Sequence, residues 1–129
     1  MPVDVVVCET CRPTAAGEGG DVWTGAMFAA LLQGALATSR EVGPRPEEGG
    51  PTVTTMRCLM NCRRACAVHI RSPGRMGYVL GDLVPDQSAV QALVDYLALY
   101  GRSVDGVVPW REWPDGVKGR FVARIPPAP

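Results

Sequence analysis

Five cysteines in two widely separated groups constrain the fold of this chain more than any other feature. The first group is Cys8-x-x-Cys11, and the second contains Cys58, Cys62 and Cys66. Thiolates are natural ligands of zinc and of iron–sulfur clusters, and four of them complete either kind of site. The pairs Cys8-x-x-Cys11 and Cys58-x-x-x-Cys62 supply four. The spacing therefore predicts a small redox or metal protein in which folding joins two cysteine loops.

The length and composition predict one globular domain and argue against several function classes. The chain has 129 residues, of which 47% are hydrophobic, and a formal net charge of zero. A nucleic-acid-binding protein normally carries a basic excess, so no nucleic-acid partner is expected. No membrane partner is expected, because no stretch reaches the ~20 apolar residues that span a bilayer. The chain is not expected to be an enzyme, since it has no phosphate-binding glycine loop, paired catalytic carboxylates or nucleophile–base constellation.

The cysteines are expected to work in the cytoplasm. Residues 1–7 lack the basic and apolar regions of a signal peptide. In that reducing compartment, clustered cysteines are more often metal ligands or redox catalysts than structural disulfides. An odd number of cysteines also fits poorly with a disulfide framework.

Hydrophobic runs and turn residues predict the order β-α-β-β-α in residues 1–101. The predicted elements are a strand at 3–7, a helix at 21–38, a strand at 52–56, a hairpin of strands at 67–71 and 76–80, and a helix at 86–100. The first two strands should be parallel, across a right-handed crossover. The hairpin should lie at one edge of the sheet. The expected fold class is therefore α/β.

The two predicted helices should be buried to different extents. The first, with Asp21 as its N-cap, carries few charges, so most of its circumference should be covered. The second should begin after Asp86 and end at Gly101 as its C-cap. One apolar stripe follows the spacing i, i+3, i+4, i+7 along the second helix and should pack on the sheet: Val90, Leu93, Val94 and Leu97.

Residues 102–129 differ in composition from the rest and form a proline-rich C-terminal extension. Trp110, Trp113 and Phe121 would be costly to leave in water, so we expect the extension to pack on the domain formed by residues 1–101. Three prolines among the last four residues should end the chain in an extended conformation.

The order strand–Cys, helix, strand–Cys-x-x-x-Cys, hairpin, helix resembles the thioredoxin-like [2Fe-2S] ferredoxins. Residues 58–62 read Cys-Leu-Met-Asn-Cys, where that family shows Cys-Leu-Gly-x-Cys. The ferredoxins then show a hairpin with a tyrosine, which Tyr78 matches. This resemblance implies a thioredoxin-like fold, an electron-transfer function with a redox partner protein, and a [2Fe-2S] cluster held by Cys8, Cys11, Cys58 and Cys62. Such ferredoxins tend to pair, and an exposed hairpin edge favours self-association, so a homodimer is also expected.

A second resemblance covers nearly the whole chain and is more specific. Val-Cys-x-Thr-Cys at 7–11 and Val-Pro-Trp-Arg-Glu at 108–112 are similar to a family of small predicted metal-binding proteins. Members of that family are often encoded near cobalamin-biosynthesis genes, and their function is unsettled. Two features depart from the ferredoxins: Cys8 and Cys11 are closer together than usual, and Cys66 stands where they tend to have proline. The second departure leaves the thiol of Cys66 without a ligand role. Cys66 is expected to be a buried small residue, and the alternatives are that it replaces another ligand or acts as a resolving thiol.

Three other interpretations of the cysteines remain open. Zinc or cobalt could occupy the same four thiolates in a metal-delivery protein, although zinc ribbons favour Cys-x-x-Cys on both sides. A thioredoxin-type disulfide catalyst would need Cys8 and Cys11 at a helix N-terminus, whereas Arg12-Pro13 and a glycine-rich loop follow them. Cysteines buried only as core residues are the third interpretation.

The run 57–75 contains no carboxylate and five arginines: Arg57, Arg63, Arg64, Arg71 and Arg75. These cations could offset the negative charge of a cluster, or form a docking patch for an acidic redox partner. His69 is the only histidine, and a Rieske centre needs two, so we expect a surface residue or a neighbour of the ligands.

Overall fold

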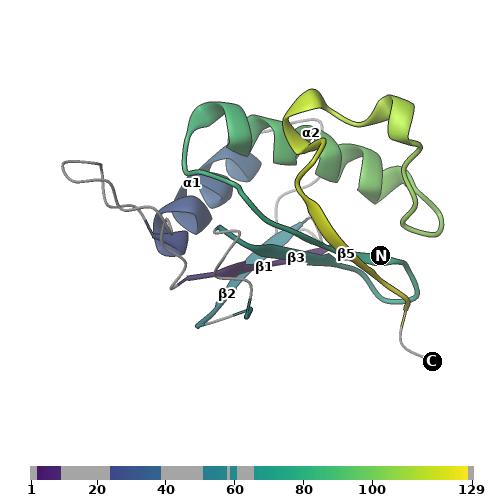
Figure 1. Cartoon of the computed structure of the whole chain (residues 1–129), viewed down its shortest axis with the longest axis horizontal. Helices are drawn as coiled ribbons and strands as arrows, with labels where there is room; N and C mark the ends of the chain where they lie inside the picture. The colour runs from purple at the N-terminus through teal and green to yellow at the C-terminus, as the bar shows by residue number, and fades with distance from the viewer. Residues whose placement is uncertain (1–2, 10–23, 39–50, 58, 61–65, 128–129) are drawn as a thin grey trace.

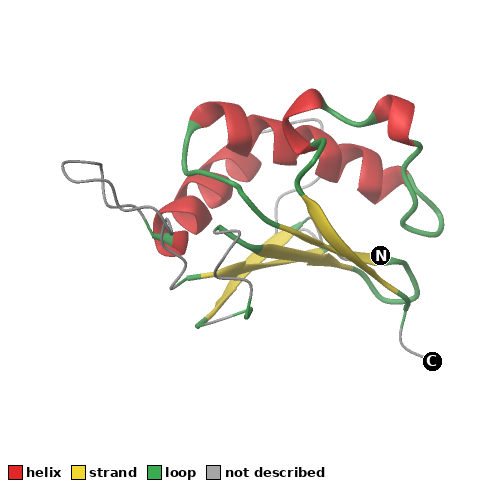
Figure 2. Cartoon of the chain, in the orientation of Figure 1, coloured by secondary structure: helices red, strands yellow, loops and turns green. Residues whose placement is uncertain are grey.

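In the computed structural model, which describes residues 3–9, 24–38, 51–57, 59–60 and 66–127, the chain has a mixed α/β fold, as predicted. Both long helices lie on the same side of one sheet (Figures 1 and 2). This architecture is compatible with a thioredoxin-like fold. The elements are β1 (Asp4–Cys8), α1 (Gly25–Thr38), β2 (Thr52–Met56), β3 (Val68–Arg71), β4 (Gly77–Leu80), α2 (Gln87–Arg102), the short 3-10 helices η3 (Trp110–Glu112) and η4 (Asp115–Val117), and β5 (Phe121–Ile125).

The five strands form one sheet in the order β2-β1-β3-β4-β5. The pair β1–β2 is parallel, and β3–β4 is an antiparallel hairpin, so both predictions are confirmed. The prediction of an exposed hairpin edge is wrong. Strand β5 pairs antiparallel with β4, with Gly77 opposite Ile125, and covers that edge. The edge strands of the sheet are therefore β2 and β5.

One face of the sheet carries the core, because its side chains alternate with a period of two. Val5, Ile70 and Leu80 are each fully buried under the helices. Burying a side chain of this size is worth roughly 1.5–3 kcal/mol. A one-residue slip of a strand would turn its whole apolar set to the other face, so these residues fix the register. The predicted stripe of α2 lies in the same core and is at most 2% exposed: Val90, Leu93, Val94 and Leu97.

Helix α1 is buried on one side only, so the prediction that most of its circumference is covered is wrong. Phe28 and Leu32 are fully buried, whereas Met27 is 49% and Leu31 is 37% exposed. The sheet and α2 both pack against the same side of α1. The low number of charged residues in α1 does not mean that another element covers its other side. The helix begins at Gly25, later than predicted, and the predicted cap Asp21 lies outside the described residues. No helix in the described part of the chain is long and apolar enough to cross a membrane.

The predicted N-cap of α2 is confirmed and its predicted C-cap is wrong. The Asp86 side chain accepts a hydrogen bond from the Ala89 N–H, whereas the helix continues through Gly101 and is capped by Ser103. Its last carbonyls are bonded by a buried cation, Arg75, which is 4% exposed. The Arg75 Nη1 atom donates to the carbonyls of Tyr100 at 2.8 Å, Ser103 at 3.1 Å and Gly101 at 3.3 Å. Arg75 therefore adds hydrogen bonds to carbonyls at the carboxyl end of α2, the negative end of its dipole.

Replacing Arg75 by lysine should lower the free energy of unfolding by about 2 kcal/mol. The lysine ammonium is one bond closer to the backbone than the Nη1 atom that makes all three bonds, and it loses the contact of the planar guanidinium with the Tyr100 ring. Urea unfolding followed by circular dichroism measures this change. Arg111→Lys is a matched control, because Arg111 is exposed on η3. An unchanged unfolding midpoint in Arg75→Lys would show that the carbonyls are equally well served by charge alone.

The C-terminal segment packs two of its three large aromatic side chains into the fold. Trp113 stacks on Phe121 with ring centroids 4.3 Å apart, and both pack against the core. The Trp113 indole N–H donates to the Val108 carbonyl at 2.8 Å. Trp110 departs from expectation: it is 63% exposed, and the Lys118 ammonium lies 4.4 Å from its ring centroid.

Candidate functional site

The carboxyl ends of β1 and β2 meet beside the predicted cysteine loops. Cys8 ends β1 and stands in register with Met56, which ends β2. The Glu9 N–H donates to the Met56 carbonyl at 2.9 Å, so the two strands stay together as the chain leaves β1. On the other side, the Cys8 N–H donates to the Ala67 carbonyl at 3.0 Å. Cys8 therefore lies between the segment that leads to Cys58 and the segment that follows the second cysteine loop.

The Cys8 thiol faces the start of that second loop. Its Sγ atom lies 3.7 Å from the Arg57 carbonyl oxygen and is a donor to it, and the residue is 1% exposed. Because Arg57 directly precedes Cys58, the thiol lies beside the residue before a second predicted ligand. The other predicted ligands, Cys11, Cys58 and Cys62, lie outside the described residues.

Cys66 is a buried residue held by backbone hydrogen bonds. Its N–H donates to the Leu83 carbonyl at 2.9 Å, and the Leu83 N–H donates back at 3.3 Å. The Cys66 Sγ atom lies 4.0 Å from the Cys8 carbonyl oxygen and 3.9 Å from that of Ala67. The Cys66 thiol thus packs against the backbone of Cys8, in the core.

The first residue of α1 lies directly against Cys8. A Cβ atom added to Gly25 would collide with the Cys8 carbonyl group, 2.7 Å from its carbon, and would lie 3.2 Å from the Glu9 Cα atom. The Ala26 N–H also donates to the Glu9 carbonyl at 3.1 Å. The amino end of α1 therefore packs against the backbone of Cys8 and Glu9, at the end of β1. This contact was not predicted, because its only signal in the sequence is a glycine near the start of a helix.

The second cysteine loop has a backbone conformation that favours glycine. Met60 has a φ angle of 59°, in the left-handed region, and its side chain is 89% exposed. This is the position at which the thioredoxin-like ferredoxins show glycine. The neighbouring Leu59 is partly buried against the core.

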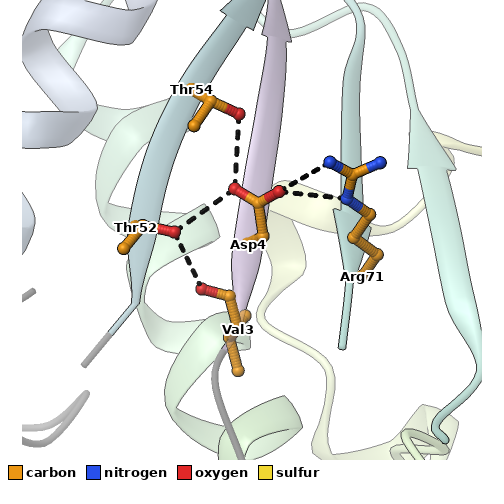
Figure 3. A network of polar contacts seen from close by, with 5 residues as sticks. All are labelled: Val3, Asp4, Thr52, Thr54 and Arg71. Carbon is orange, nitrogen blue, oxygen red and sulfur yellow. Dashed lines mark hydrogen bonds and ion pairs between the residues drawn. The ribbon is translucent and has the colours of Figure 1, made fainter. Parts of the chain in front are cut away.

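Two of the five arginines have partners unrelated to the cysteines. The Arg71 Nη2 and Nε atoms bond to Asp4 Oδ2 at 2.9 and 3.0 Å (Figure 3). Arg75 binds the end of α2, as described above. Arg71 and Arg75 therefore have structural partners in the fold, and the hypotheses of charge compensation and of a docking patch stay predictions. Arg63 and Arg64 lie outside the described residues.

His69 is half-buried in β3, where it alternates with the core residues Val68 and Ile70 and so lies on the sheet face opposite the helices. Its strand neighbours are Val6 and Val79. Burial lowers the pKa of its imidazole below 6.5, the positive charge of Arg71 lowers it further, and Asp4 partly opposes the shift. The ring is therefore neutral at pH 7. Among the described residues, no group of three or more His, Cys, Asp and Glu side chains is placed to hold a metal ion.

Comparison with known proteins returns one family. The model of a family described as "Protein of unknown function (DUF1636)" matches residues 5–127. That range includes all five cysteines and the C-terminal segment through β5. No curated protein and no solved structure matches the chain. The match agrees with the resemblance to a small family of unsettled function and gives no support for the resemblance to ferredoxins.

Proposed function

We propose that this chain, which belongs to the DUF1636 family, is a cytoplasmic electron-transfer protein of the thioredoxin-like [2Fe-2S] ferredoxin type. The observation that carries the proposal is the 3.7 Å contact between Cys8 Sγ and the Arg57 carbonyl oxygen. It brings Cys8 to Arg57, the residue that precedes Cys58 in the sequence. The proposed cluster ligands are Cys8, Cys11, Cys58 and Cys62.

The chemistry of this donor set fits such a group. Four thiolates complete a [2Fe-2S] site, and the cluster supplies reversible one-electron transfer when it is bound. The side chain of Cys8 is 1% exposed, so the protein would keep water away from that ligand. The amino end of α1 packs against the backbone of Cys8 and would help to hold this ligand in position. The left-handed backbone at Met60 gives the second loop a conformation that suits the glycine of the ferredoxin pattern.

The proposal includes a redox partner protein and self-association. Arg57 is exposed beside Cys8, and Arg63 and Arg64 follow Cys58 in the sequence, so an acidic partner surface would be complementary. Self-association would use the edge strand β5, since β5 replaces the hairpin as an edge of the sheet. Val122 and Ile125 of β5 are 41% and 37% exposed.

Visible spectroscopy and elemental analysis of protein purified without oxygen test the proposal. We expect a red-brown protein with about two irons and two sulfides per chain, which bleaches on reduction and recovers on reoxidation. Colourless protein with about one zinc per chain, or protein with cobalt in place of iron, would replace the proposal with the metal-delivery alternative. A sample that binds none of these metals at the cysteines would contradict both.

A further inference from the structure

A pocket of about 510 Å³ lies on the sheet face opposite the helices. It is lined by the first residue of β1, Asp4, and by the residue opposite it in β3, Arg71. Cys8 is at the other end of β1, so the pocket lies away from the proposed cluster ligands. A volume in this range is typical of sites for small molecules. Whatever the pocket binds is therefore independent of the cysteine chemistry.

The carboxylate in the pocket has no acceptor capacity left. Asp4 Oδ1 accepts hydrogen bonds from the hydroxyls of Thr52 and Thr54, each at 3.3 Å. Asp4 Oδ2 accepts two more from Arg71 (Figure 3). A carboxylate offers about four acceptor positions. Asp4 is thus occupied as a support for Arg71, and a ligand that brings donors or a positive charge would find no partner there.

Arg71 has donors to spare. A guanidinium carries five N–H groups, and Asp4 takes two of them. Within the described part of the chain, the other N–H groups of Arg71 meet no acceptor, and its side chain is 57% exposed. Because both the position and the plane of the guanidinium are fixed by Asp4, these donors are preorganised for a ligand that brings acceptors.

Most of the remaining pocket wall is apolar, with His69, Ser72 and the largely buried Arg75 as its other polar residues, and Gly77 leaves space at its base. A Cβ atom at Gly77 would lie 3.2 Å from the Ile70 carbonyl oxygen, 3.3 Å from His69 Nε2 and 3.7 Å from Ile125 Cβ. A side chain there would fill the space between His69 and Ile125. Two prolines that follow β5, Pro126 and Pro127, also line the pocket. The ligand should therefore combine an apolar body with its acceptor group.

We propose that this pocket binds a small organic monocarboxylate whose flat apolar body lies over Gly77 and whose carboxylate accepts hydrogen bonds from Arg71. A carboxylate matches the planar guanidinium and carries a single negative charge. A phosphate dianion fits less well, because the Asp4 carboxylate lies next to the guanidinium of Arg71. The second arginine that lines the pocket, Arg75, is only 4% exposed and its Nη1 atom bonds to the end of α2. The combination of apolar walls with one charged anchor is typical of small-molecule sites.

Titration of the full-length protein with trans-cinnamate, followed by backbone amide chemical shifts, tests the proposal. Cinnamate should bind at one saturable site and shift the amides of Arg71, Gly77 and Ile125. Its uncharged counterpart cinnamamide should bind about tenfold more weakly, because it loses the charge-assisted bond to the guanidinium. Absence of saturable cinnamate binding, equal affinity for the two probes, or shifts confined to other parts of the chain would overturn the proposal.

Two variants approach the pocket from opposite sides. Arg71→Gln removes the charged anchor, and Gly77→Ala fills the space at the base of the pocket, so each should weaken cinnamate binding about tenfold. Arg111→Gln and Gly34→Ala are matched controls, because Arg111 is exposed on η3 and a Cβ atom at Gly34 meets nothing within 4 Å. If Arg71→Gln fails to fold without its support of Asp4, Gly77→Ala carries the test alone. Parental affinity in a folded pocket variant would overturn the proposal.

Discussion

Serine at any one of the four proposed ligand positions should abolish the visible absorption of the purified protein or alter it severely. The four single variants are Cys8→Ser, Cys11→Ser, Cys58→Ser and Cys62→Ser. A serine hydroxyl stays protonated at neutral pH and is a poor ligand for iron, whereas a thiolate is the ligand that such clusters use. Absorption spectra and iron content, measured on protein purified without oxygen, give the result directly.

The matched control is Cys66→Ser, which should keep the absorption. Cys66 is fully buried and its Sγ atom contacts the carbonyl oxygens of Cys8 and Ala67, so it has a packing role in the core. A buried hydroxyl can cost about 1–3 kcal/mol if it lacks a good partner, so circular dichroism should accompany the spectrum. Loss of absorption in a folded Cys66→Ser variant, with retention in Cys11→Ser, would make Cys66 the fourth ligand.

The parts of the fold that follow local patterns could be predicted from the sequence. The alternation in β1 and the helical stripe of α2 each lie within one element, and the structure buries both as expected. Strand β5 was not predicted, because 121–125 obtains its strand hydrogen bonds from β4, a partner that lies far earlier in the chain. The exposure of Met27 and Leu31 was not predicted either. The composition of a helix shows which side chains can be buried, but it does not show whether the fold has elements on both sides of that helix.

Only part of the candidate site could be predicted from the sequence. Cysteines at the ends of two predicted strands suggested that their loops meet. The structure places Cys8 beside Arg57, and the meeting of the four cysteines stays a prediction, because the other three lie outside the described residues.

The partners of the individual arginines could not be predicted, because residues that are close in sequence are separated by the hairpin. Arg71 is the last residue of β3 and bonds to Asp4. Arg75 lies between β3 and β4 and bonds to the carboxyl end of α2. A run of arginines in the sequence shows that positive charges are present. The partner of each arginine depends on the three-dimensional fold.

The contact between α1 and Cys8 predicts the second large effect. Gly25→Ala should lower the free energy of unfolding by about 3 kcal/mol, because the new methyl group meets backbone atoms of Cys8 that have no rotamer by which to move away. Gly34→Ala, in the same helix, has nothing within 4 Å of the new methyl group and should stabilise the protein by about 0.5–1 kcal/mol. Urea unfolding of both variants measures the difference.

The same pair of variants links stability to the proposed site. If the α1 terminus positions Cys8, Gly25→Ala should also reduce the iron bound per folded chain, even at a temperature at which the variant remains folded. Gly34→Ala should bind iron like the parent protein. A Gly25→Ala protein that is as stable as Gly34→Ala would contradict the close approach of α1 to β1. A destabilised Gly25→Ala protein with parental iron content would keep that contact and show that Cys8 holds its position without help from the helix.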